Sequence, residues 1–192
     1  AMALDAAGNL VVAGDAIVKY DANGAFLWRV EPSFQAQHVS LDSGGNIVVA
    51  GTKGTTAKYS PAGVELWSRA INTTPATDDV VRAMAMDNDG NIYVSAQNYA
   101  AGNSDYMTVK FDPAGTELWR MATATQSGAY FASAALAVDA SRGLILASNA
   151  IAPGNPAAIT LTRYRPVVPS PSITSAIAGN SSFSAAPTGL PQ

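Results

Sequence analysis

Acidic and cationic side chains recur at fixed places along this sequence and are the first candidates for chemistry. The acidic set is Asp5, Asp42, Asp87 and Asp139, and the cationic set is Lys19, Lys58, Lys110 and Arg163. Carboxylates gathered on one face would form a ring of cation ligands. Alternatively, each Asp stands shortly before a turn residue and caps its own turn. We expect the capping role, because the turn tips of neighbouring repeats diverge.

Three tryptophans, Trp28, Trp67 and Trp119, each follow a Leu and present two alternatives. Exposed indoles would suit stacking against sugars, whereas recurrence at one position of a repeat favours a packing role. The motif Asp-x-x-Gly-x-x-x-Trp is similar to the tryptophan-docking blades of quinoprotein dehydrogenases. Those blades usually carry Thr-Gly-Lys before the Trp, which this chain lacks, so we expect packing and no quinone cofactor.

Other motifs point to catalysis or metal binding only weakly. The segment 87–91 (Asp-Asn-Asp-Gly-Asn) superficially resembles a calcium loop, but Ile92 holds the position where an EF-hand needs Gly, so we expect a hairpin turn. His38 is the single histidine and has no evident acid–base partner in the sequence. We therefore expect no catalytic residue, no metal site and no cofactor, and the chain is predicted not to be an enzyme.

Composition excludes several classes of partner. The chain has 192 residues, no cysteine, a charged fraction of 13% and a net charge of −3. This balance gives no electrostatic reason to bind nucleic acid, and no apolar run is long enough to insert into a membrane. Without cysteine, disulfides and thiolate chemistry are also excluded.

The sequence repeats itself at intervals of about forty to fifty residues, which is typical of propeller blades. In the block from 80 to 122, alternating apolar residues and turn signals predict strands at 81–87, 91–96, 106–111 and 116–121. Equivalent blocks cover about 1–30, 36–70 and 132–165. The predicted fold class is all-β: blades of four antiparallel strands, as a partial or four-bladed β-propeller. The small residues of each first strand, and His38 with them, are expected to face a central channel.

The pattern Ala-x-Asp-x-x-Gly-Asn-x-x-Val, followed by Tyr-x-x-Val-Lys-Phe-Asp-Pro-x-Gly-x-x-Leu-Trp, resembles the SBBP-type β-propeller repeat. This resemblance spans residues 1–165. It implies a bacterial secreted or cell-surface protein, usually with more than four blades, and implies no catalytic residues.

The last part of the chain, 166–192, is rich in Pro, Ser and Ala. It predicts a linker, and 172–177 resembles the opening strand of an immunoglobulin-like module. Two arrangements remain for the repeats: a closed four-bladed ring, or an open arc. We favour the arc, whose uncovered ends predict self-association or further blades in a longer protein.

The connections between repeated strands suggest where a ligand binds. The one-to-two and three-to-four turns share one face and are short, whereas the opposite face carries longer polar connections at 71–79, 97–105, 123–130 and 149–156. Rigid scaffolds often bind through such variable loops. The expected contact residues are Asp78, Asp79, Asn98, Tyr99, Asn103, Gln126 and Tyr130, with His38.

The function expected from these features is a non-catalytic scaffold or binding module, extracellular or on the cell surface, with a protein or glycan as partner. Alternatives are a lectin, or a propeller enzyme or cofactor-bearing, quinoprotein-like domain.

Overall fold

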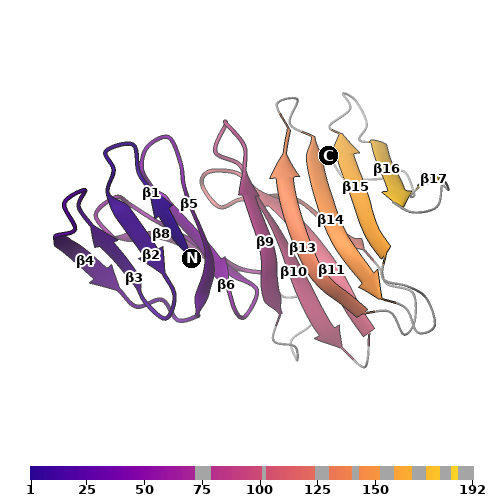
Figure 1. Cartoon of the computed structure of the whole chain (residues 1–192), viewed down its shortest axis with the longest axis horizontal. Coiled ribbons are helices and arrows are strands. Elements are labelled where there is room, and N and C mark those ends of the chain that lie inside the picture. Colours follow the sequence, from indigo (N-terminus) through magenta and orange to yellow (C-terminus); the bar gives the residue numbers. More distant parts are fainter. Residues whose placement is uncertain are drawn as a thin grey trace.

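The computed structural model describes residues 1–71, 79–100, 103–123, 130–139, 143–151, 158–165, 172–177 and 183–185, with backbone alone at some strand ends and throughout 172–177 and 183–185. Every regular element within these ranges is a β-strand. The strands form four antiparallel sheets that follow one another along the chain (Figure 1). The fold class expected from the sequence is therefore confirmed.

We call the sheets blades 1 to 4. Blade 1 contains β1 (Met2–Leu4), β2 (Leu10–Ala13), β3 (Ile17–Tyr20) and β4 (Phe26–Val30). Blade 2 contains β5 (Ala36–Leu41), β6 (Ile47–Gly51), β7 (Thr55–Tyr59) and β8 (Glu65–Ala70). Blade 3 contains β9 (Val80–Met86), β10 (Ile92–Ala100), β11 (Asn103–Phe111) and β12 (Glu117–Thr123). Blade 4 contains β13 (Tyr130–Val138), β14 (Leu144–Ile151), β15 (Ala158–Arg165), β16 (Ser172–Ile177) and β17 (Phe183–Ala185).

Within a blade, each strand pairs with the next one in the chain, so the hairpin turns determine the register. The first turn of blade 2 touches the last, since a Cβ on Gly45 would lie 3.7 Å from the ring of Pro61. In blade 3 the equivalent distance from Gly90 to Pro113 is 3.4 Å. The short turns of a blade therefore share one face, as the sequence predicts.

The hydrophobic core is divided among the contacts between blades rather than gathered in one centre. One cluster joins blades 1 and 2 around Ile17 and Val49, and a second joins blades 2 and 3 around Val48 and Val94. A third joins Tyr93 of blade 3 to residues of blade 4. Because each cluster needs two sheets, a blade buries its apolar side chains only against its neighbours.

The two faces of an inner strand meet different neighbours, which corrects one expectation. Met84 packs into the cluster shared with blade 2, whereas Tyr93, opposite Ala85 in the register, packs against blade 4. The small residues of the first strands therefore lie on the face toward the following blade and do not line a channel. Side chains of a pleated sheet stand perpendicular to it, so the inner edge of a blade exposes mainly backbone.

The blades form a series with blade 1 and blade 4 at opposite ends (Figure 1). The inner strands β1, β5, β9 and β13 lie in order, each beside the next. This arrangement corresponds to the open arc rather than to the closed ring.

The tail adds strands to blade 4. β16 pairs with β15 in an antiparallel register from Arg165↔Ser172 to Thr160↔Ile177, and β17 pairs with β16. The segment expected to begin an immunoglobulin-like module thus occupies the position of a fourth blade strand. Its Ser, Thr and Ile residues suit either environment, and the sequence offered no signal for the partner strand.

Candidate ligand-contact face and the repeated polar side chains

The repeated carboxylates and cations pair within their own blades. Lys19 Nζ lies 3.0 Å from Asp5 Oδ2, Lys58 Nζ lies 2.9 Å from Asp42 Oδ2, and Lys110 Nζ lies 3.9 Å from Asp87 Oδ2. Arg163 pairs with Asp139 in the same way. These side chains are mostly buried. Each ion pair joins the end of the first strand to the third strand of the same blade.

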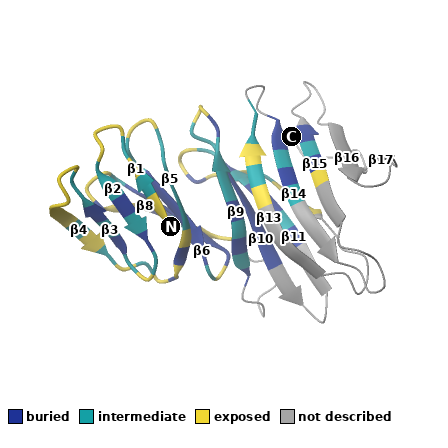
Figure 2. Ribbon diagram, viewed as in Figure 1, coloured by how far each residue is buried: buried dark blue, intermediate teal, exposed yellow. Residues whose placement is uncertain are grey.

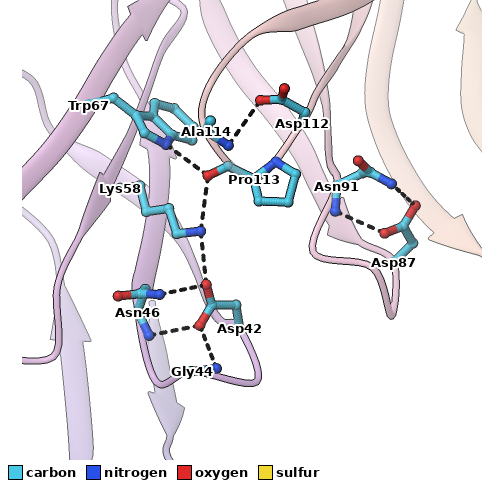
Figure 3. Close-up of polar contacts among 10 residues, drawn as sticks. All are labelled: Asp42, Gly44, Asn46, Lys58, Trp67, Asp87, Asn91, Asp112, Pro113 and Ala114. Atoms are coloured by element: carbon cyan, nitrogen blue, oxygen red, sulfur yellow. Dashed lines mark hydrogen bonds and ion pairs between the residues drawn. The ribbon is translucent and has the colours of Figure 1, made fainter.

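The same carboxylates cap the first turn of their blade. Asp42 Oδ1 accepts hydrogen bonds from the backbone nitrogens of Gly44 and Asn46, both at 2.9 Å, while Asn46 Nδ2 donates to Oδ2 (Figure 3). Asp5 and Asp87 make the equivalent bonds. The capping role expected from the sequence is confirmed, and segment 87–91 is a hairpin turn.

Donors around these carboxylates lower their pKa values. Hydrogen bonds from Asn9 hold the pKa of Asp5 well below its ordinary range. Burial raises the pKa of Asp42, but the donors Lys58 and Asn46 outweigh it, so the pKa is lowered. Asp87 behaves likewise, with burial outweighed by Asn91, Tyr93 and Lys110. All three carboxylates are therefore charged at neutral pH and already satisfied.

The tryptophans link one blade to the next. Trp28 Nε1 donates to the carbonyl oxygen of Pro61 at 3.0 Å, and Trp67 Nε1 donates to that of Pro113 at 3.2 Å. Lys58 Nζ also donates to Pro113 O, at 3.1 Å (Figure 3). Trp67 belongs to the core between blades 2 and 3, and Trp28 and Trp119 pack against the other two clusters. The packing role is thus confirmed.

A glycine in each receiving turn makes room for the indole. A Cβ on Gly115 would lie 2.6 Å from Trp67 Cδ2, and a Cβ on Gly63 would lie 3.0 Å from Trp28 Cδ2. Turn chemistry alone accounts for glycine at these positions when only the sequence is considered. The sequence carries no signal that the indole of another blade packs against them.

His38 lies in the contact between blades 2 and 3. Its Nε2 is 3.2 Å from the carbonyl oxygen of Val81, on the inner strand of blade 3. Burial lowers the pKa of His38, against a raising effect of the Val81 hydrogen bond, and the nearby charges of Arg82 and the N-terminus lower it further. The half-buried ring therefore does not line a channel, contrary to the expectation for this face.

No metal-binding cluster accompanies His38 in the described ranges. Over those residues, no group of at least three His, Cys, Asp or Glu side chains is placed to hold a metal ion. Within the same ranges, no helix is long and apolar enough to cross a membrane.

The predicted contact residues have different positions. Asp78 and Gln126 lie outside the described residues. Asn98, Tyr99, Asn103 and Tyr130 lie in strands, and the structure describes their backbone only. Asp79 is described in full and is 1% exposed.

Two of these placements correct the sequence interpretation. Segment 97–105 is not a long loop. β10 and β11 continue through it as an antiparallel hairpin, in which Asn98 lies opposite Asp105 and Tyr99 opposite Ser104. Backbone pairing does not depend on side-chain polarity, so a polar run gave a misleading loop signal. Asp79 is buried, and its carboxylate does not lie on an open surface.

Two polar contacts are not predicted by the repeat pattern. Arg82 Nε donates to Gln97 Oε1 at 2.8 Å, and Gln97 itself is 2% exposed. Lys53 Nζ donates to the carbonyl oxygen of Ser33 at 2.8 Å, and Lys53 adopts φ 58°. These residues do not recur between blades, so the repeat gave no signal for them.

Comparison with known proteins shows what the fold of this chain is similar to. No protein-family model matches the chain, and no curated protein matches it. A crystal structure of a protein of unknown function from Bacteroides caccae matches with a TM-score of 0.55 and 12% identity, covering 91% of this chain and 70% of that one. That similarity shows a shared fold.

The structure of BamB from Moraxella catarrhalis matches with a TM-score of 0.35 and 10% identity, covering 85% of this chain and 79% of that one. A TM-score of 0.35 is too low to support a statement about fold or function.

Proposed function

We propose that this chain is a non-catalytic scaffold or binding module that contacts a protein or glycan through the ends of its long connections. The observation that carries the proposal is the use made of the repeated polar residues. The Asp–Lys pairs join strands within blades, and Trp28 and Trp67 join blades to each other. The polar and aromatic side chains that recur between blades thus stabilise the array. The residues that differ between blades remain available to bind a partner.

The proposed contact surface is the blade face opposite the short turns, at the strand ends that border the connections 71–79, 97–105, 123–130 and 149–156. Tyr99 and Tyr130 are its principal proposed contacts, because a phenol combines apolar area with a hydrogen-bonding group. Asn98, Asn103, Asp78 and Gln126 are proposed to add polar contacts. The buried Asp79 and the half-buried His38 are left out of this surface.

The resemblance of the repeat to the SBBP type supports a more specific assignment. We propose that the chain belongs to the bacterial SBBP-type propeller repeats of secreted or cell-surface proteins. Its low charge and lack of cysteine are compatible with that location.

The test uses glycan and peptide arrays probed with the full chain, followed by titration of any ligand found. Tyr99→Ala and Tyr130→Ala are each expected to weaken binding at least tenfold, since truncating an aromatic anchor commonly costs about 2 kcal/mol or more. The matched control is Asn88→Ala, on the exposed turn between β9 and β10, which is expected to bind normally. Unchanged binding in both tyrosine variants would refute the assignment of the face.

A further inference from the structure

The contacts between blades 1 and 2 and between blades 2 and 3 use one device, which we call the indole seat. It consists of the three-to-four turn of the receiving blade, with a carbonyl acceptor at its second residue and a glycine at its fourth. Trp28 occupies the seat formed by Pro61 and Gly63, and Trp67 occupies the seat formed by Pro113 and Gly115.

Blade 1 carries the same turn at residues 21–25. Asp21 N donates to Ala25 O at 2.8 Å, and Gly24 N donates to Asp21 O at 3.0 Å. The turn at 112–116 has the equivalent bonds at 2.9 and 3.0 Å, and its glycine has φ 81°, against 83° for Gly24. Asp21 Oδ1 also accepts from Asn23 N and Ala25 N, as Asp112 does from Ala114 N and Thr116 N. The backbone of the seat is therefore complete in blade 1, with Ala22 in place of the proline.

Among the residues that the structure describes, none occupies this third seat. A Cβ on Gly24 would meet no atom within 4 Å, whereas the same atom on Gly63 or Gly115 would be in contact with an indole. Ala22 and Gly24 are both exposed.

The sheet face beside the empty seat is apolar and uncovered. In blade 2 the face toward blade 1 includes Ile47 and Val49, both fully buried. The equivalent residues of blade 1 are Leu10 and Val12, which are only partly buried. Beside them Met2 is 73% exposed and Leu4 is 67% exposed. Figure 2 shows the exposed residues of blade 1 at this end of the array.

We propose that blade 1 binds a further four-stranded blade of this same repeat type, whose outer strand places a Leu-Trp indole on the seat at residues 21–25. The two occupied seats argue for this partner, because the empty one matches them in turn geometry, in the position of its glycine and in the apolar face beside it.

A second copy of this chain fits the empty seat less well. Trp28 and Trp67 are already seated, and Trp119 contacts Tyr93 edge-on, with ring centroids 6.2 Å apart. β16, the fourth strand of blade 4, contains no Trp. A copy docked through blade 4 would cover the face and leave the seat unfilled.

The first test fuses a copy of residues 36–82 ahead of Ala1, because Ala83 takes in blade 3 the register position that Ala1 takes in blade 1. The readout is hydrogen exchange at the amides of 21–25. The added blade is expected to slow this exchange at least tenfold, and replacing its tryptophan by Ala is expected to abolish the protection. Equal protection with and without that tryptophan, or no protection in either fusion, would overturn the proposal.

The second test leaves the chain unaltered and so does not depend on folding of the fusion. N-acetyltryptophanamide is titrated against the chain, with N-acetylleucinamide as the control, and amide resonances are followed by NMR. The indole probe is expected to shift Gly24 and Ala22 at lower concentration than Gly63 and Gly115, whose seats are filled. Equal response at all three glycines, or an equal effect of the leucine probe, would contradict the empty seat.

A concentration series on the same unaltered chain distinguishes the rival occupant. Sedimentation together with exchange at 21–25 is expected to show no concentration-dependent protection. Protection that grows as a dimer forms would identify a second copy as the occupant and overturn the proposal.

Discussion

The indole nitrogen of Trp67 and the side-chain nitrogen of Lys58 donate to the same acceptor, the carbonyl oxygen of Pro113, at 3.2 and 3.1 Å. The two donors lie opposite each other on neighbouring strands of blade 2, and the acceptor lies in the turn of blade 3. One carbonyl thus connects the packing of the blades to the ion pair inside blade 2, because Lys58 also pairs with Asp42.

Replacing Trp67 with Ala is expected to destabilise the chain by about 3–5 kcal/mol, because it removes a large core side chain and leaves a cavity between blades 2 and 3. Urea unfolding followed by circular dichroism measures the change. Trp28→Ala is the matched comparison, and its loss should be smaller because Trp28 is less buried. A loss below about 1 kcal/mol for Trp67→Ala would contradict its role as an anchor.

Gly115→Ala and Gly24→Ala form a pair that separates backbone strain from packing. Both glycines have positive φ, at 81° and 83°, so each alanine carries a similar strain of about 1–2 kcal/mol. Only Gly115 faces an indole, so its substitution is expected to cost a further 1–3 kcal/mol, roughly, from overpacking against Trp67. Thermal unfolding of the two variants tests this, and equal losses would show that the indole yields without cost.

Asp42→Asn is expected to cost roughly 3 kcal/mol, since it leaves the ammonium of Lys58 mostly buried without its carboxylate. The exposed pair Arg29–Glu31, with N···O 2.7 Å and the Glu31 side chain 70% exposed, provides the control. Glu31→Gln should change the unfolding free energy by less than about 1 kcal/mol. Similar losses in both variants would mean that burial of the Asp42 pair adds nothing.

Acid should destabilise the chain in a definite range of pH. The folded pKa values of Asp5, Asp42 and Asp87 are lowered, whereas an unfolded Asp titrates near about 3.9. The unfolded chain therefore binds protons first as pH falls, so this contribution to stability is complete above about pH 4 and is lost as pH drops through the lower folded values. Unfolding free energies measured from pH 6 to pH 2 should fall, and the fall should be shallower in Asp42→Asn.

His38 should add a second, weaker pH dependence at higher pH. Burial and two nearby cationic groups, Arg82 and the N-terminus, lower its folded pKa relative to about 6.5 in the unfolded chain. The neutral ring is thus favoured in the folded state, so stability should decrease as pH falls below about 6.5. Urea midpoints at pH 7.5 and 5.5 should differ in the parent chain and converge in His38→Gln. An unchanged difference in the variant would assign the effect to another group.

The repeat allowed the blades to be predicted because its signals are local. Turns such as 87–91 and 112–115 combine an Asp cap with a glycine at positive φ, and both requirements can be recognised within five residues. The partner of an indole is not local. Trp67 and Pro113 are separated by 46 residues, and the acceptor is a backbone carbonyl, which carries no sequence signature.

The contact face was harder to predict for a related reason. Segments such as 97–105 are polar, and polarity alone did not distinguish a loop from an extended hairpin like that formed by β10 and β11. Burial of Asp79 depends on the neighbouring loop of blade 2, where Gly54 N donates to Asp79 O and the Gly54 carbonyl accepts from Ile71 N. That packing arises from two blades together and has no trace in either one alone.

Trp28 and Trp67 both bond to the blade that follows in the chain and neither bonds to the preceding one, which gives this part of the array a direction. Blade 2 carries both a donor indole and a receiving turn, so duplicating it would repeat an existing joint rather than require a new one. Genes encoding such arrays can lengthen or shorten by recombination without new compensating substitutions, and the diameter of the finished assembly then depends on copy number rather than on redesign of any single joint.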